Sequence, residues 1–144
     1  MLLGEGHPKY RAVAAVALGK LATPETTEVL GKGLQDPDER IRSASTRALA
    51  KAGAIDGTLA LLRRAWQDNS PSVRGASLEA MAVVDNRVGL AIARGAARRP
   101  DSSRRRWVHE GALAVLAEHG DRSDIATIGA MLGPKTPSLS LIHI

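Results

Sequence analysis

The sequence predicts an all-α chain, an α-α superhelix in which about four helical hairpins stack side by side as a right-handed α-solenoid. Two observations predict this fold. A segment with the periodicity of a helix recurs with copies that begin at residues 10, 41, 73 and 108. Aromatic residues make up only 2% of the chain and Phe is absent. The core must therefore consist of Ala, Leu, Val and Ile, which suits closely packed helices.

The recurring segment has one apolar stripe along a helix. Each copy begins with an apolar residue, has a small residue four positions later, and has an apolar pair at positions seven and eight after the first. The small residues are Ala14, Ser45, Ser77 and Ala112. We expect a neighbouring helix to approach the chain closely at these positions.

Residues that start and stop helices surround each segment. Prolines and short acidic or polar side chains precede the segments at Pro8, 36–38 and 68–71, where they predict helix N-termini. Gly19, Gly53 and Gly120 follow, and we expect them to end the first helices in the left-handed conformation. A second, shorter helix is then expected over 24–34, 55–66, 87–97 and 122–132. The predicted units are 5–34, 36–66, 68–97 and 101–132, within an array that spans 1–133.

A short motif links successive units. An Asp is followed, after four residues, by an aliphatic residue and then an Arg, as in Asp36 to Ile41–Arg42 and Asp68 to Val73–Arg74. Over about 8–132 the chain resembles HEAT repeats of the short bacterial, phycobilisome-lyase HEAT-like type. The resemblance implies a hydrogen-bonded ladder between repeats, formed here by Arg11, Asp36, Arg42, Asp68 and Arg74. Unit one departs from the motif with Glu5 and Tyr10, and unit four departs with Ser103 at the acid position and His109 at the arginine position.

The residues at both ends of the chain indicate that the sequence is a fragment of a larger protein. Neither end carries the polar capping helix that a solenoid requires. The hexapeptide 139–144 resembles the translation of a transposon end used as a sequencing adapter. We therefore expect 134–144 to be a non-native or disordered tail, and we assign no function to His143.

The net charge of +5 favours an anionic partner. Arginines crowd residues 98–106, and other cations lie on the predicted second helices. HEAT-like DNA glycosylases use a basic groove of this kind, but they also need aromatic and acidic residues that have no counterpart here. Trp66 and Trp107 are interpreted as packing residues, and a solvated basic face is the favoured interpretation. The candidate binding surface comprises Lys32, Arg63, Arg64, Arg94 and Arg98.

No catalytic, cofactor or metal site is predicted. A zincin helix needs His-Glu-x-x-His, but His109–Glu110 is followed by Leu113. No nucleophile elbow is found, and Gly31–Lys32–Gly33 lacks the strand–turn–helix setting of a phosphate loop. The absence of Cys excludes disulfides and thiolate metal sites. No apolar run reaches the ~20 residues of a membrane span, so we expect a cytoplasmic protein.

The resemblance implies a non-catalytic scaffold that binds another protein or another domain of its own chain. Three alternatives remain open at this stage. The first is a C-terminal HEAT arm of a bacterial gluzincin aminopeptidase-like metallopeptidase, suggested by 68–97 and 107–113, with the zinc motif outside this sequence. The second is nucleic-acid binding through the basic surface. The third, a bilin lyase or its relative, is disfavoured because nothing marks a chromophore pocket.

Overall fold

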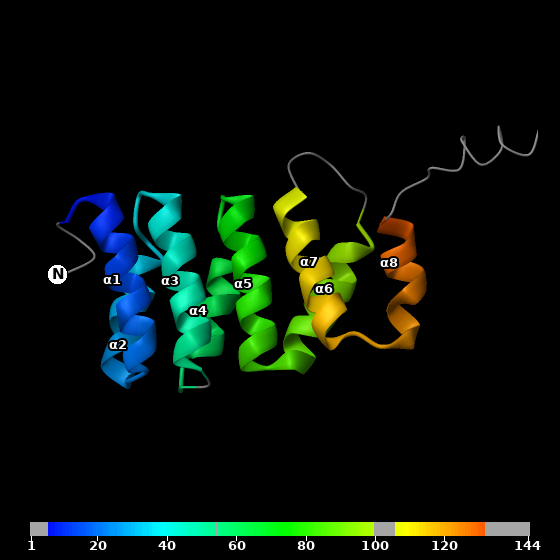
Figure 1. Ribbon diagram of the computed structural model, residues 1–144, viewed down its shortest axis with the longest axis horizontal. Helices are drawn as coiled ribbons and strands as arrows, with labels where there is room; N and C mark the ends of the chain where they lie inside the picture. The colour runs from blue at the N-terminus through cyan, green and yellow to red at the C-terminus, as the bar shows by residue number, and fades with distance from the viewer. Residues whose placement is uncertain (1–5, 54, 100–105, 132–144) are drawn as a thin grey trace, which may run out of the picture.

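The chain folds into two rows of helices, seen in a computed structural model that describes residues 6–53, 55–99 and 106–131 (Figure 1). The first helices of the hairpins form one row: α1 (Pro8–Leu21), α3 (Glu39–Ala52), α5 (Pro71–Val84) and α7 (Arg106–His119). The second helices α2 (Pro24–Gly33), α4 (Thr58–Ala65) and α6 (Asn86–Ala97) form the other row. The 3-10 turn η2 (Arg122–Asp124) and α8 (Ile125–Met131) follow α7, and α8 stands at the end of the array (Figure 1). No strand occurs within the described ranges.

This arrangement confirms the predicted all-α solenoid. Each first helix packs beside the first helix of the next unit, and α1 to α6 also pack in hairpin pairs. Glu5, Ser103, Arg104, Arg105 and the tail 134–144 lie outside the described residues.

Short polar side chains cap the N-termini of the helices by accepting hydrogen bonds from backbone N–H groups. The Asp38 carboxylate accepts from the backbone N–H of Arg40 before α3, and Ser70 accepts from that of Val73 before α5. Thr23 forms a capping box with Thr26 before α2. These bonds satisfy backbone donors that have no partner inside a helix.

Two second helices start differently from the prediction. The helix expected from residue 55 begins at Thr58, because Gly57 takes a left-handed conformation with φ 87° and breaks the helix before it. The helix expected from residue 122 opens with the 3-10 turn η2, and α-helical structure follows from Ile125.

The predicted C-terminal glycines have three different roles. Gly53 follows α3 directly with a positive φ of 83°, but its ψ of -157° differs from the left-handed helical conformation that was predicted. Gly19 was wrongly predicted to end a helix, because it lies inside α1, and Ala22 takes the left-handed position with φ 51°. Gly120 follows α7 without a positive φ, so that prediction is also wrong.

Glycines instead let the first helices approach one another closely. A Cβ atom at Gly19 would lie 2.7 Å from the carbonyl oxygen of Ala48 on α3. A Cβ at Gly75 would lie 2.5 Å from the carbonyl oxygen of Trp107, and one at Gly111 would lie 2.8 Å from that of Gly75. Side chains at these positions would force α1 from α3 and α5 from α7.

The predicted apolar stripe is buried in units two to four. Ile41 and Val73 at its first position are fully buried, as are the small Ser45 and Ser77. Unit one departs from the pattern: Tyr10 at the first position is 72% exposed. The reason is that α1 packs against α2 and α3, and no described helix covers its other side.

The buried stripe predicts a contrast between two equivalent alanines. Ala48 on α3 is 2% exposed, whereas Ala17, at the same repeat position on α1, is exposed. Ala48→Asp buries an unpaired carboxylate and is expected to lower the free energy of unfolding by at least about 3 kcal/mol. Ala17→Asp is the matched control and should change it little. Urea unfolding followed by circular dichroism measures both, and equal effects would show that the helix faces are assigned wrongly.

Candidate functional site

The connections between units carry a row of arginine–aspartate contacts. Arg11 of α1 donates through Nη1 to the Asp36 carboxylate of the next unit. Arg42 of α3 donates through Nε and Nη2 to the two carboxylate oxygens of Asp68, at 2.8 and 3.2 Å. The structure thus brings four of the five ladder residues into two interunit ion pairs. We call the edge of the stack that carries these residues the ladder edge.

Each aspartate also organises the connection in which it lies. Asp36 accepts from the backbone N–H of Asp38 at 2.9 Å, and Asp68 accepts from that of Ser70 at 2.8 Å. Arg42 reaches back through Nη1 to the carbonyl oxygen of Asp36 at 2.8 Å. One guanidinium therefore ties the connection before α3 to the connection before α5.

The fifth ladder residue, Arg74, has only part of this pattern. Its Nη1 donates to the carbonyl oxygen of Asp68 at 2.7 Å and to that of Asn69 at 3.2 Å. No carboxylate in the described part of the chain accepts a hydrogen bond from it. His109, at the arginine position of unit four, is 7% exposed within α7.

The exposed cations of the candidate binding surface gather where second helices end. Lys32 lies in the last turn of α2, Arg63 and Arg64 lie in the last turn of α4, and Arg98 follows α6 directly. Lys32 also pairs with Glu28 at 3.3 Å. Cations near helix C-termini interact favourably with the unpaired carbonyl groups there. These residues therefore have a structural explanation that needs no bound anion.

Arg94 differs from these residues, and the structure corrects its assignment to an open basic surface. Its Nε and Nη2 donate to the two carboxylate oxygens of Asp124 at 2.7 and 2.8 Å, and Nη2 also contacts Asp121 at 3.2 Å. Asp124 is 2% exposed. The pair joins α6 to the fourth hairpin and neutralises the charge. The sequence spacing between Arg94 and Asp124 gave no signal for this contact.

Hydrogen bonding sets the acidity of this pair. Hydrogen bonds from Arg94, and then from the backbone N–H of Asp121, lower the pKa of Asp124 from 3.8 to about 2. The same carboxylate raises the pKa of Arg94. Both groups are therefore charged at neutral pH.

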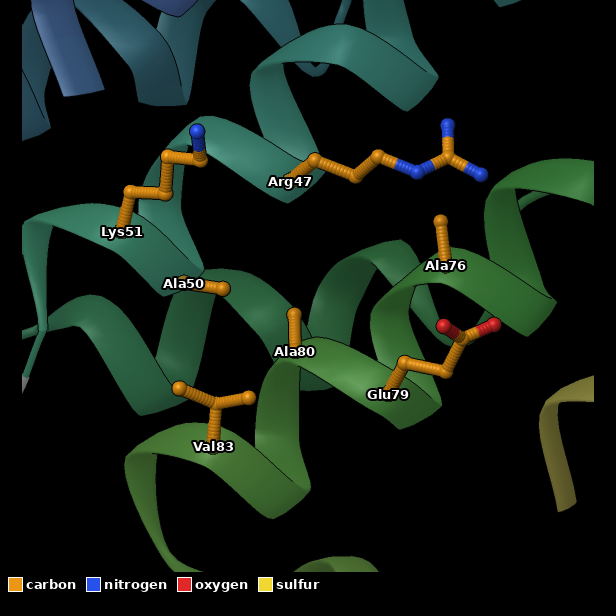
Figure 2. A pocket seen from close by; sticks show the side chains of 7 residues that line it. All are labelled: Arg47, Ala50, Lys51, Ala76, Glu79, Ala80 and Val83. Carbon is orange, nitrogen blue, oxygen red and sulfur yellow. The ribbon is translucent and has the colours of Figure 1, made fainter. Parts of the chain in front are cut away.

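A groove lies between α3 and α5 on the first-helix row (Figure 2). Its volume is about 260 Å³. Small and apolar side chains line its floor, and charged side chains stand on either side: Arg47 and Lys51 on α3, and Glu79 on α5. We call this feature the α3–α5 groove. Its apolar lining consists of Ala50, Ala76, Ala80 and Val83.

The groove exposes apolar surface beside an acid, Glu79, that is exposed to solvent but partly desolvated by its neighbours. Val83 at its end is 62% exposed. The neighbouring protein partly desolvates the Glu79 carboxylate and raises its pKa, with Arg47 acting in the opposite direction and Glu118 in the same direction. Sequence analysis missed this site, because alanines at these positions look like ordinary packing residues.

The described residues contain no gathered set of metal ligands. No three His, Asp or Glu side chains come together within 6–53, 55–99 and 106–131. His109 is buried in α7, while Glu110 accepts a hydrogen bond at 2.9 Å from Arg106 one turn earlier. Among the helices so described, none is long and apolar enough to cross a membrane.

Comparison with known families agrees with this geometry. The family model of HEAT repeats matches residues 1–82, which is more than half of the chain. The chain belongs to the HEAT-repeat family. HEAT repeats generally act as scaffolds for protein interaction and are typically non-catalytic. Comparison with curated proteins gave no match.

The HEAT ladder predicts unequal effects for two arginines of α3. The side chains of Arg42 and Asp68 are only 17% and 12% exposed, whereas that of Arg40 is 76% exposed. Arg42→Met leaves Asp68 without its interunit partner and is expected to cost about 2–4 kcal/mol of unfolding free energy. Arg40→Met removes the same charge from the same helix and should have little effect. Urea unfolding compares the two, and equal midpoints would mean that the ladder does not stabilise the stack.

The Arg94–Asp124 pair predicts an acid-sensitive fourth hairpin. Because the pKa of Asp124 is lowered, the pair stabilises the hairpin above about pH 4, and this stabilisation is lost as the pH falls towards 2. Helical Cα chemical shifts of 122–131 should decrease over that range in NMR spectra. Arg94→Met should decrease them already at pH 7, while Arg87→Met on the exposed face of α6 should not. Unchanged shifts in Arg94→Met would contradict this role of the pair.

Proposed function

We propose that this chain is a protein-interaction scaffold that binds an amphipathic helix of a partner in the α3–α5 groove. The observation that carries the proposal is an open groove with a small, mainly apolar lining, bordered by charges of both signs. A helix that presents alternate turns of apolar side chains fits such a groove, and its flanking charges set the orientation.

Charge indicates how the partner would lie. Arg47 and Lys51 are one helical turn apart on α3, whereas Glu79 stands on α5 (Figure 2). Arg47 donates to Ser43 Oγ, which holds its side chain beside the groove. An acidic residue of the partner would pair with this basic side, and a hydrogen-bond donor would satisfy the Glu79 carboxylate.

The size of the groove favours a helix over a cofactor. Sites for drug-sized ligands usually occupy about 300–1,000 Å³ and enclose most of the ligand. The α3–α5 groove is smaller, at about 260 Å³, and is lined mainly by short side chains. It has room for one or two aliphatic side chains from a partner that otherwise lies on the surface.

Nucleic-acid binding has less support than protein binding. The exposed cations Lys32, Arg63, Arg64 and Arg98 lie at helix C-termini, where they have favourable interactions without a ligand. Of the two tryptophans, Trp107 lies under the Arg106 guanidinium, 5.8 Å from the ring centre. This contact disfavours a role for the Trp107 ring in stacking on nucleic-acid bases.

The finer family assignment is part of the proposal. The motifs from Asp36 to Arg42 and from Asp68 to Arg74 support the short bacterial, phycobilisome-lyase HEAT-like subtype. A cytoplasmic scaffold agrees with a chain that has no Cys. The partner helix belongs either to another protein or to a further domain of the same polypeptide, such as a metallopeptidase domain to which this array would be an arm.

The proposal predicts which peptides the protein selects. A phage-displayed library of helical 16-residue peptides should yield binders with aliphatic residues at helical spacing beside Asp or Glu. Val83→Asp places a carboxylate at the apolar end of the groove and should weaken these peptides by at least about tenfold, since it opposes both the apolar contact and the charge pattern. Fluorescence anisotropy with a labelled selected peptide measures the change.

Val13→Asp provides the matched control. Val13 on α1 is 61% exposed, against 62% for Val83, so the two substitutions add the same charge at equal exposure. The control should bind as the wild type does. If the selected peptides bind the Val83→Asp variant as tightly as they bind the wild-type protein, they bind outside the groove and the proposal is wrong. A library that gives no enriched sequence, or displacement by duplex DNA with steep salt dependence, would also count against it.

A further inference from the structure

A cavity on the ladder edge stands where a third arginine–aspartate pair would follow the first two. It lies between the ends of α4 and α6 and the starts of α5 and α7, and its volume is about 360 Å³. Polar and charged side chains contribute most of its lining. The residues that matter here are Trp66, Gln67, Arg74 and Arg99.

Arg74 repeats half of the contacts that Arg42 makes. In both residues Nη1 donates to the carbonyl oxygen six residues earlier, at 2.8 Å for Arg42 and 2.7 Å for Arg74. In both, Nη1 also contacts the carbonyl oxygen five residues earlier. The two guanidinium groups are thus anchored in the same way to their own connections.

The other half of the pattern differs between the two arginines. Nε and Nη2 of Arg42 hold the Asp68 carboxylate. The same atoms of Arg74 make no hydrogen bond to any residue within the described ranges, and the side chain faces the cavity. Arg42 therefore shows what an arginine anchored in this way can bind. It binds a carboxylate through two parallel N–H groups.

A second cation lies at the same cavity. Arg99, directly after α6, is exposed and has no hydrogen bond from its guanidinium to a described residue. Two guanidinium groups beside one polar cavity repel each other, and a bound anion relieves that repulsion. Gln67 adds an amide at the wall, and Trp66 gives the cavity an aromatic edge.

We propose that this cavity binds a carboxylate of a protein partner, an Asp or Glu side chain or a C-terminal carboxylate, between Arg74 and Arg99. The bound group would occupy the position that Asp68 has relative to Arg42. The partner would in this way continue the ladder of the stack with an acid of its own. This inference is independent of the α3–α5 groove, which lies on other residues.

The chain contains its own reporter for the test. Trp66 lines the cavity, and the only other tryptophan is Trp107. In a Trp107→Phe background, the emission of Trp66 follows binding directly. The probes are the capped tripeptides acetyl-Gly-Asp-Gly-amide and acetyl-Gly-Asn-Gly-amide, titrated at constant ionic strength, with inorganic phosphate as a third probe.

The Asp peptide should change the Trp66 emission in a saturable way, and the Asn peptide should not. Arg99→Gln should weaken the Asp peptide by about tenfold or more, because it removes a charge-assisted contact from an exposed side chain that makes no described bond. Arg74→Gln should do the same, and Arg99→Gln keeps the test valid if Arg74→Gln destabilises the fold. Arg63→Gln removes one exposed cation from the neighbouring α4 and should bind as the unaltered protein does.

Several results would overturn the proposal. Equal binding of the Asp and Asn peptides would exclude recognition of charge, and an equal loss in Arg63→Gln and Arg99→Gln would reduce the effect to net charge. Tighter binding of phosphate than of the Asp peptide would refute the choice of a carboxylate. Val83→Asp should leave this titration unchanged, so this site and the groove can fail separately.

Discussion

The close approach of the first helices is the constraint on which the rest of this structure depends. The backbones of α1 and α3, and of α5 and α7, come so near that Gly19, Gly75 and Gly111 could not carry a Cβ without a clash. The row can form only because the facing positions are glycine, alanine or serine. Close packing of this kind gains dispersion contacts over the whole length of each helix, and it leaves little tolerance for added volume.

The ladder and the groove both follow from this spacing. Once the first helices lie side by side, the connections that precede α3 and α5 are near enough for Arg42 to reach its own connection and Asp68 of the next. Between α3 and α5 the residues that face outward are short, so the surface is hollow there instead of filled. The same small side chains that permit stacking thus create the surface that we propose for a partner helix.

Arginine charge has two different roles in the stack. Asp36, Asp68 and Asp124 each accept hydrogen bonds from an arginine of another unit, and these pairs join neighbouring repeats. Arg74 and Arg99 line a cavity that holds no carboxylate of a described residue, and we propose that a partner's carboxylate binds there. In this proposal, the type of contact that joins units within the stack would also join the stack to a partner, at the cavity where the third pair is missing.

The sequence by itself determined the helices and their stacking. The apolar stripe through Ile41 and Val73 and the motif from Asp36 to Arg42 depend on local periodicity and spacing, which are visible in one dimension. Tertiary structure alone decided the partner of Arg94, the contact role of Gly19 and the hollow above Ala80. These features depend on distances between residues that are far apart in the chain, and the properties of a single residue do not encode such distances.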